Sequence, residues 1–135
     1  MTLLPAALAV LMLQATAPVR TIARGDQSGV NAERQVVART AAEWTALWHQ
    51  HAPEQPAIVV DFAKEMVVAV FLGSRNTAGY SVEIFGAGTD QGSFVVRYRQ
   101  RAPSADAITA QIITTPFHIV AVPNTSAAVR FERVP

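Results

Sequence analysis

The chain of 135 residues contains no cysteine. This absence excludes disulfides, zinc–thiolate sites, cysteine nucleophiles and a lipid-modified N-terminal cysteine. A large excess of one charge is also missing, since 11 basic residues stand against 10 acidic ones and Lys64 is the only lysine. A formal net charge of +1 gives no bulk attraction to nucleic acid or to anionic lipid. We therefore expect neither a nucleic-acid partner nor a metal or other cofactor.

Charged side chains are missing from residues 1–17, MTLLPAALAVLMLQATA. The apolar run Leu3–Leu13 has the length of a secretory signal and is too short to span a bilayer comfortably. The A-x-A motif Ala15-Thr16-Ala17 follows it as a cleavage site. We predict a signal peptide over 1–17 and a periplasmic or secreted domain over 18–135. The alternatives are a mis-chosen start codon or an uncleaved anchor, which would be the one source of membrane contact.

The strand pattern around which the domain is organised is Met66–Leu72, which is apolar at both odd and even positions and is followed by Gly73. Such a run predicts a central strand that is covered on both faces. After the polar turn 73–79, apolar side chains alternate with others from Tyr80 to Phe85, which predicts a half-buried strand. We expect the two strands to be hairpin neighbours.

One helix is predicted over residues 41–51. Thr40 and Glu43 have the spacing of a capping box, in which Thr40 accepts from the amide three residues later and Glu43 reaches back. One face of the helix is apolar and aromatic, and Pro53 ends it. That face consists of Trp44, Leu47, Trp48 and His51.

The rest of the chain reads as short strands between turns, with a glycine-rich turn over 86–92. Together with the helix, these patterns predict a single-domain α+β fold, mainly an antiparallel β-sheet with one capped amphipathic helix packed on it. The further strands are expected over 19–23, 35–38, 94–99, 108–115, 117–122 and 129–133.

The order and spacing of several short motifs are similar to those of the PrcB C-terminal domain family. The resemblance extends over roughly residues 40 to 132. Ala78 stands where the family often has glycine, and the chain lacks the lipid-anchoring cysteine of the namesake subunit. The motifs are Glu43-Trp44, Leu47-Trp48, Asp61-Phe62, Met66–Val70, Gly73-Ser74-Arg75, Gly79-Tyr80 and Thr115–Val120.

The family is named after a lipoprotein subunit of an extracellular protease complex, which associates with a subtilisin-like protease. The resemblance therefore implies an exported, non-catalytic binding or assembly module with a protein partner, namely a secreted serine protease. It gives no catalytic residue to carry over, and we expect that the chain is not an enzyme.

The polar turn 73–79 is the best candidate for partner binding, because a loop on a rigid scaffold commonly presents recognition residues. A second candidate is the arginine-bearing face of the strand over 94–99, where arginines could contact an acidic partner. The predicted partner-binding residues are Arg75, Asn76, Thr77, Gly79, Tyr80, Arg97 and Arg99.

Two other functions remain open. The segment 77–80 resembles the Thr-x-Gly-aromatic loop of chagasin-like protease inhibitors, which suggests a loop-inserting protease inhibitor. A small-ligand-binding envelope protein would instead need an apolar pocket between helix and sheet. Catalysis and metal binding have little support, because His49 and His51 are two residues apart on a helix and no Gly-x-Ser-x-Gly motif occurs.

Overall fold

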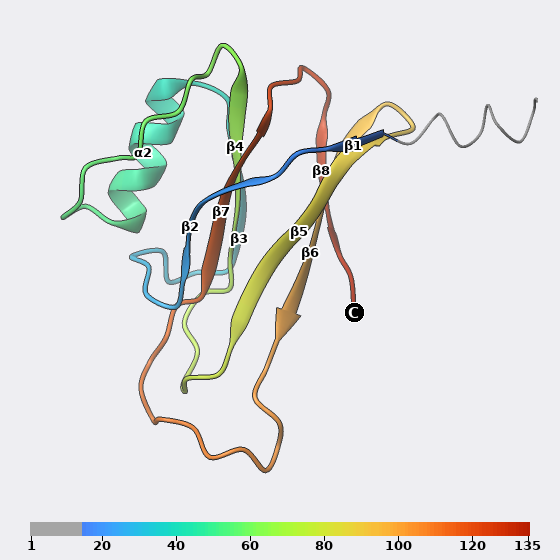
Figure 1. Cartoon of the computed structure of the whole chain (residues 1–135). Helices are drawn as coiled ribbons and strands as arrows, with labels where there is room; N and C mark the ends of the chain where they lie inside the picture. The colour runs from blue at the N-terminus through green and yellow to red at the C-terminus, as the bar shows by residue number, and fades with distance from the viewer. Residues whose placement is uncertain (1–14) are drawn as a thin grey trace, which may run out of the picture.

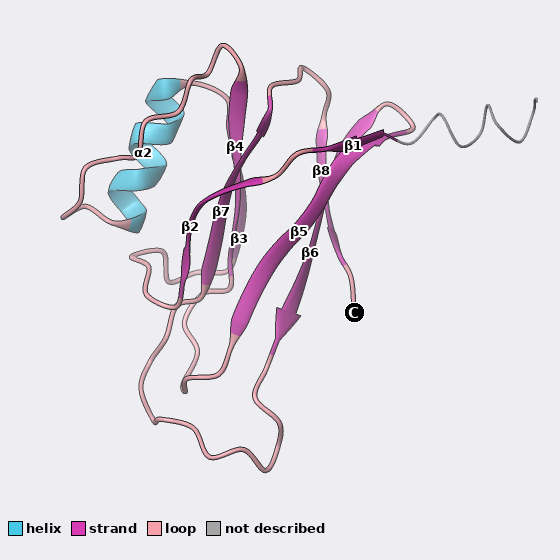
Figure 2. Cartoon of the chain, in the orientation of Figure 1, coloured by secondary structure: helices cyan, strands magenta, loops and turns pink. Residues whose placement is uncertain are grey.

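In the computed structural model of the chain, two four-stranded sheets pack face to face (Figure 1). One helix covers the outer face of one of them, called sheet 2 below. The structure describes residues 15–135, and Figure 2 distinguishes their helix, strands and loops. Sheet 1 has the order β1 (Ala15–Ala17), β5 (Ser81–Asp90), β6 (Ser93–Arg101) and β8 (Val129–Arg133). Sheet 2 has the order β2 (Arg20–Gly25), β7 (Phe117–Pro123), β4 (Glu65–Phe71) and β3 (Arg34–Ala38).

The predicted single-domain α+β fold is confirmed, with the helix α2 (Ala41–His51) as its helical layer. Neighbouring strands are antiparallel, except that β8 runs parallel to β6. The expected single sheet is divided into two, so the domain has three layers where two were predicted.

The strand β4 supplies side chains to both cores of the domain, as its apolar pattern predicts. One set of its side chains packs in the core between the two sheets, and the other set packs in the core between sheet 2 and α2. All of them are at most 1 % exposed. The first set is Met66, Val68 and Val70, continued by Leu72 just after the strand, and the second is Val67, Ala69 and Phe71.

The capping of α2 differs from the prediction by one residue. The Thr40 hydroxyl accepts a hydrogen bond from the backbone N–H of Glu43 at 3.1 Å, as expected. The Glu43 carboxylate accepts from the backbone N–H of Arg39 at 2.7 Å, one residue earlier than in a standard capping box. These bonds satisfy the amide of Glu43 in the first turn and the amide of Arg39 just before the helix, which fixes where the helix begins.

The two tryptophans of α2 pack in the core and also form hydrogen bonds with the segment that follows the helix. Their ring centroids lie 5.3 Å apart. The Trp44 indole donates to the carbonyl of Ile58 at 2.8 Å, and the Trp48 indole donates to the carbonyl of Gln55 at 3.0 Å. The segment between α2 and β4 is therefore tied to the helix by indole hydrogen bonds.

The predicted hairpin between β4 and β5 is wrong. β4 pairs with β3 and β7, whereas β5 pairs with β1 and β6 in the other sheet. Both edges of β4 are occupied by strands from distant parts of the sequence. After Gly73 the chain turns toward Asn31, whose carbonyl accepts from the backbone N–H of Ser74 at 3.1 Å. The segment 72–80 therefore crosses from sheet 2 to sheet 1.

The expected turn over 86–92 is mostly strand, because β5 continues to Asp90. A register shift between Ile84 and Gly86 marks a bulge, and Phe85 is left on the exposed side. The true turn is Gln91-Gly92, whose φ angles of 51° and 85° are both in the left-handed region. Of the glycines that suggested a turn, Gly86 lies at the bulge, Gly88 lies within the strand and only Gly92 lies in the true turn.

The predicted strand over 108–115 is also wrong. These residues belong to the long loop 102–116 between β6 and β7, where Thr114 forms one isolated bridge with Arg75. The three isoleucines of the segment do not lie on a packed surface, and β propensity depends on such packing. Pro116 separates the loop from β7.

Residues 1–14 of the predicted signal peptide lie outside the described residues. Ala15–Ala17, the predicted cleavage motif, forms β1 and pairs with Ala87–Thr89 of β5. Within residues 15–135, no helix is long and apolar enough to cross a membrane.

Candidate functional site: an arginine-lined cleft beside an exposed loop

The loop 72–80 has a backbone that its surroundings fix. Gly73 has a φ of 76°, and a Cβ atom there would lie 2.8 Å from the backbone nitrogen of Glu33. Gly79 has a φ of 99°, and a Cβ atom there would meet the Pro103 side chain at 3.0 Å. Both positions therefore need glycine, for conformation and for space.

Arg75 is held at the centre of this loop. Its backbone N–H donates to the carbonyl of Thr114 at 2.7 Å, and its carbonyl accepts from the Thr114 N–H at 2.9 Å. The buried Thr114 hydroxyl donates to the carbonyl of Thr77 at 2.9 Å. The Arg75 guanidinium lies 5.6 Å from the centroid of the Tyr80 ring, within cation–π range.

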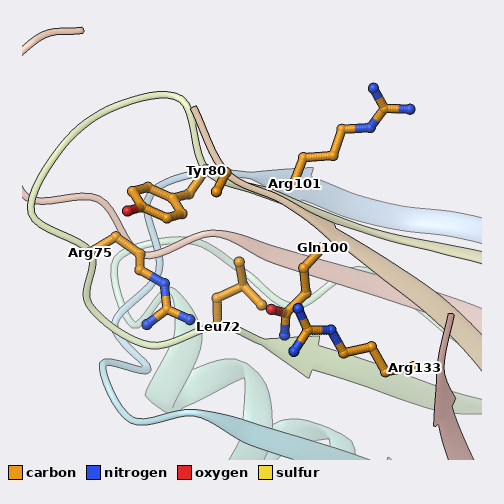
Figure 3. Close-up of a pocket in the computed structure, with 7 residues that line it drawn as sticks. Leu72, Arg75, Tyr80, Gln100, Arg101 and Arg133 are labelled. Atoms are coloured by element: carbon orange, nitrogen blue, oxygen red, sulfur yellow. The ribbon is translucent and has the colours of Figure 1, made fainter. Parts of the chain in front are cut away.

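A cleft of about 330 Å³ opens between this loop and the ends of β6 and β8 (Figure 3). The guanidinium groups of Arg75 and Arg133 extend toward each other, with Leu72 and Gln100 between them, whereas Arg101 points away (Figure 3). The lining residues are Leu72, Arg75, Tyr80, Gln100, Arg101, Ala102 and Arg133.

The cleft has an uncompensated positive charge. Its lining contains three arginines and no carboxylate. Among residues 15–135, the ion pairs use other arginines, namely Arg20, Arg24, Arg97 and Arg130. Guanidinium groups present planar forks of donors that match carboxylate and phosphate oxygens. The arrangement can therefore bind an anion, with Tyr80 and Leu72 as apolar walls.

The predicted binding residues do not form one site. Arg75 and Tyr80 line the cleft, and Thr77 and Gly79 shape its loop, while Asn76 is exposed at the loop surface and does not line the cleft. Of the predicted residues, the structure thus brings only Arg75 and Tyr80 together at the cleft.

Arg97 and Arg99 lie on the outer face of sheet 1. Arg97 donates from Nε to the Glu132 carboxylate at 3.1 Å, and its Nη2 lies 3.7 Å from Asp90. Hydrogen bonds from Arg97 and then Arg130 hold the pKa of Glu132 below its ordinary value. Arg99 lies 4.1 Å from the centroid of the Phe85 ring. These two arginines are engaged within the sheet, and neither contributes to the cleft.

The loop 102–116 borders the cleft and carries exposed apolar side chains. Ile108 is 102 % exposed, Ile113 is 69 % exposed and Ile112 is 52 % exposed. The loop backbone is nonetheless tied to the neighbouring loop, because the N–H of Ala78 donates to the carbonyl of Ala110 at 3.0 Å. Sequence reasoning missed this feature because the isoleucines suggested a packed strand.

Arg133 was also missed as a site residue. The sequence predicts Arg133 only as part of a last strand. It reaches the cleft because β8 pairs in parallel with β6, so that Arg133 lies opposite Tyr98. No local pattern specifies that pairing, since parallel neighbours are set by tertiary contacts.

Two buried histidines hold the fold together and were not assigned to a site. His118 of β7 accepts a hydrogen bond at Nδ1 from the Ile84 backbone N–H at 2.8 Å, beside the β5 bulge. Its Nε2 lies 2.9 Å from the Thr21 hydroxyl. Burial, followed by the nearby Arg24, lowers the pKa of His118 to about 4. His118 is thus a neutral link between the two sheets.

His51 ends α2 in the second core. Its Nδ1 lies 2.7 Å from the Ser28 hydroxyl, and its ring packs edge-on at 4.3 Å from Phe117. Burial lowers its pKa. Within residues 15–135, no three histidine, aspartate or glutamate side chains gather as a metal site.

The comparisons with known proteins support one family. The model of the family described as PrcB C-terminal matches residues 66–123, from β4 to the end of β7. The match confirms the resemblance and includes the loops 72–80 and 102–116, while α2, β8 and Arg133 lie outside it. No curated protein and no solved structure matches the chain.

Proposed function

We propose, from the match of residues 66–123 to the PrcB C-terminal family, that the chain is an exported, non-catalytic binding and assembly module. Its partner is a protein outside the cytoplasm, in the first place a secreted serine protease whose complex it stabilises. The proposal assigns the chain no cofactor and no reaction of its own.

The observation that carries this proposal is that charged groups and exposed apolar groups lie side by side at one end of the domain. An arginine-lined cleft lies beside a loop with three exposed isoleucines, and hydrogen bonds between the two loops fix their backbones. Exposed apolar groups beside polar ones are typical of protein interaction surfaces. A rigid scaffold also lowers the entropy cost of binding.

The two other functions have weaker support. The loop 73–79 is bridged to Thr114 through Arg75, so it lies against its neighbour instead of protruding alone as an inhibitory loop would. The space between α2 and sheet 2 is filled by aromatic side chains such as Trp44 and Phe71, which belong to one buried cluster. A small-ligand site between helix and sheet is therefore less favoured than a surface for a protein.

The test is a pull-down of the tagged full chain from the native cell envelope and culture fluid, after chemical cross-linking and with mass spectrometry as the readout. We expect a secreted serine protease to be recovered, to be active, and to lose activity faster when the chain is deleted. A recovered protease that is inhibited would instead establish the inhibitor function. Recovery of no protein above an untagged control would contradict the proposal.

A further inference from the structure

We propose that the partner segment bound by this chain is acidic and apolar, with a carboxylate held between Arg75 and Arg133 and apolar side chains placed on the loop 102–116. This inference rests on the proposed function, because it takes the partner to be a protein, and it names the chemistry by which the partner is recognised.

The acidic part of the segment follows from the cleft. The guanidinium groups of Arg75 and Arg133 extend toward each other and no carboxylate lines the space between them (Figure 3). Two facing guanidinium groups repel each other, and a carboxylate between them removes the repulsion while accepting paired hydrogen bonds. The Tyr80 ring beside Arg75 positions that guanidinium group before any ligand arrives.

The apolar part follows from the neighbouring loop. Ile108, Ile112 and Ile113 are all more than half exposed, although hydrogen bonds tie this loop to the chain at Ala110 and Thr114. When a partner covers isoleucines that are exposed to water on a fixed backbone, the burial of their apolar surface makes the free energy of binding more favourable. Since Ala102 of the same loop lines the cleft, one bound segment can contact both features.

A protein segment fits this surface better than an anionic bilayer does. The two inward-facing arginines lie in a concave space of about 330 Å³, which suits a side chain that enters it. Binding to anionic lipid ordinarily needs about 4–8 basic residues clustered on an exposed surface. The net charge here is +1, and Arg97 and Arg130 are already paired with Glu132.

The experiment is the selection of displayed random 12-residue peptides on the immobilised full chain. Three proteins are compared: the wild type, the double variant R75Q/R133Q, and K64E. The last is a matched control, because each variant lowers the net charge by two and Lys64 lies outside the cleft. We expect peptides that combine Asp or Glu with apolar residues to be enriched by the wild type and by K64E.

The selected peptides are then synthesised and their affinities measured. The double variant is expected to bind them about tenfold to a hundredfold more weakly, as for loss of charge-assisted hydrogen bonds. A second variant, I108S/I113S, is expected to weaken binding while leaving the urea midpoint unchanged, since both side chains are exposed.

Three outcomes would overturn the inference. One is enrichment of peptides without acidic residues, or of none at all. Another is equal affinity of the wild type and R75Q/R133Q for the acidic peptides. The third is flotation with phosphatidylglycerol vesicles that depends on Arg75 and Arg133 while no peptide is enriched, which would assign the site to a bilayer.

The pull-down and the peptide selection fail independently. If the pull-down recovers a partner but the selection shows no acidic preference, the proposed function stands and the chemistry assigned to the cleft is wrong. If acidic peptides are selected but no secreted protein is recovered, the binding site stands and the assembly function is wrong.

Discussion

At the scale of single residues, His118 connects the two sheets through its ring nitrogens. Because Nδ1 accepts from a backbone N–H, the ring carries its proton on Nε2, which then donates to the Thr21 hydroxyl. Protonation of Nδ1 would break the bond to Ile84 and place a charge in the core between the sheets. The side chain thus favours the folded state when it is neutral.

This neutral linkage predicts a dependence of stability on pH. The pKa of His118 is lowered to about 4 in the folded state from an ordinary value of 6.5, which corresponds to about 3 kcal/mol. Since the unfolded state binds more protons between these values, this stability is complete above pH 6.5 and is lost as pH falls toward 4. Burial and Arg24 both lower the pKa, while Glu83 opposes them.

The measurement is the free energy of unfolding in urea at pH 7.5 and at pH 4.5 for the wild type and His118→Asn. Asparagine retains an acceptor for the Ile84 N–H but does not titrate, so the variant should lose about 2–3 kcal/mol less on acidification to pH 4.5, where most of the linkage is already lost. His51, whose pKa is also lowered by burial, remains in both proteins and contributes equally. Identical losses in the two proteins would show that His118 is not the titrating group.

At the scale of secondary structure, α2 depends on tryptophans that have two roles. Trp44 is 3 % exposed and its indole holds the carbonyl of Ile58, so the residue joins the core to the segment before β4. We expect Trp44→Ala to reduce the free energy of unfolding by about 3–5 kcal/mol, as for other large-to-small substitutions in cores.

The matched control is Thr45→Ala, the next residue of the same helix, which is exposed. It should change the free energy of unfolding by no more than about 0.5 kcal/mol. Chemical denaturation at pH 7.5 gives both values. A loss below about 1 kcal/mol for Trp44→Ala would contradict the packing of the helix on sheet 2.

The elements that the sequence predicts correctly are those whose pattern is local. The capping box and the aromatic face defined α2 to the residue, and the apolar run Met66–Leu72 predicted that β4 is covered on both sides. In each case neighbouring residues alone determine which face is buried.

The wrong predictions concern strand pairing and site residues, which depend on tertiary contacts. The assignment of β4 and β5 to different sheets depends on β7 occupying an edge of β4, and no local signal records this. The segment 108–115 has strand propensity but joins neither sheet and forms only the isolated bridge between Thr114 and Arg75. Arg75 and Tyr80 were predicted as site residues from the loop, whereas Arg133 and the exposed isoleucines required the fold.

At the scale of the whole molecule, the two ends of sheet 1 differ in what they carry. One end has the cleft, where Ser81 of β5 lies opposite Arg101 of β6. The other end has the Gln91-Gly92 turn and the short edge strand β1, which pairs with Ala87–Thr89. Changes at the N-terminus therefore occur far along the sheet from the binding surface.

This arrangement allows a direct test of the predicted boundary between signal peptide and domain. A chain that begins at Pro18 lacks β1, which contributes three residues at one edge of sheet 1. Such edges contribute little to global stability. We therefore expect the shortened chain to fold, with a free energy of unfolding within about 1 kcal/mol of that of the full chain and unchanged affinity for acidic peptides.

Hydrogen exchange measured by mass spectrometry should show faster exchange in the shortened chain at Ala87–Thr89, because this backbone loses its partner strand. The cleft loop 72–80 should exchange as before, and it serves as the internal control. N-terminal sequencing of the exported protein then shows whether the natural cut is made at this position. A shortened chain that does not fold would place Ala15–Ala17 within the domain and move the boundary toward the N-terminus.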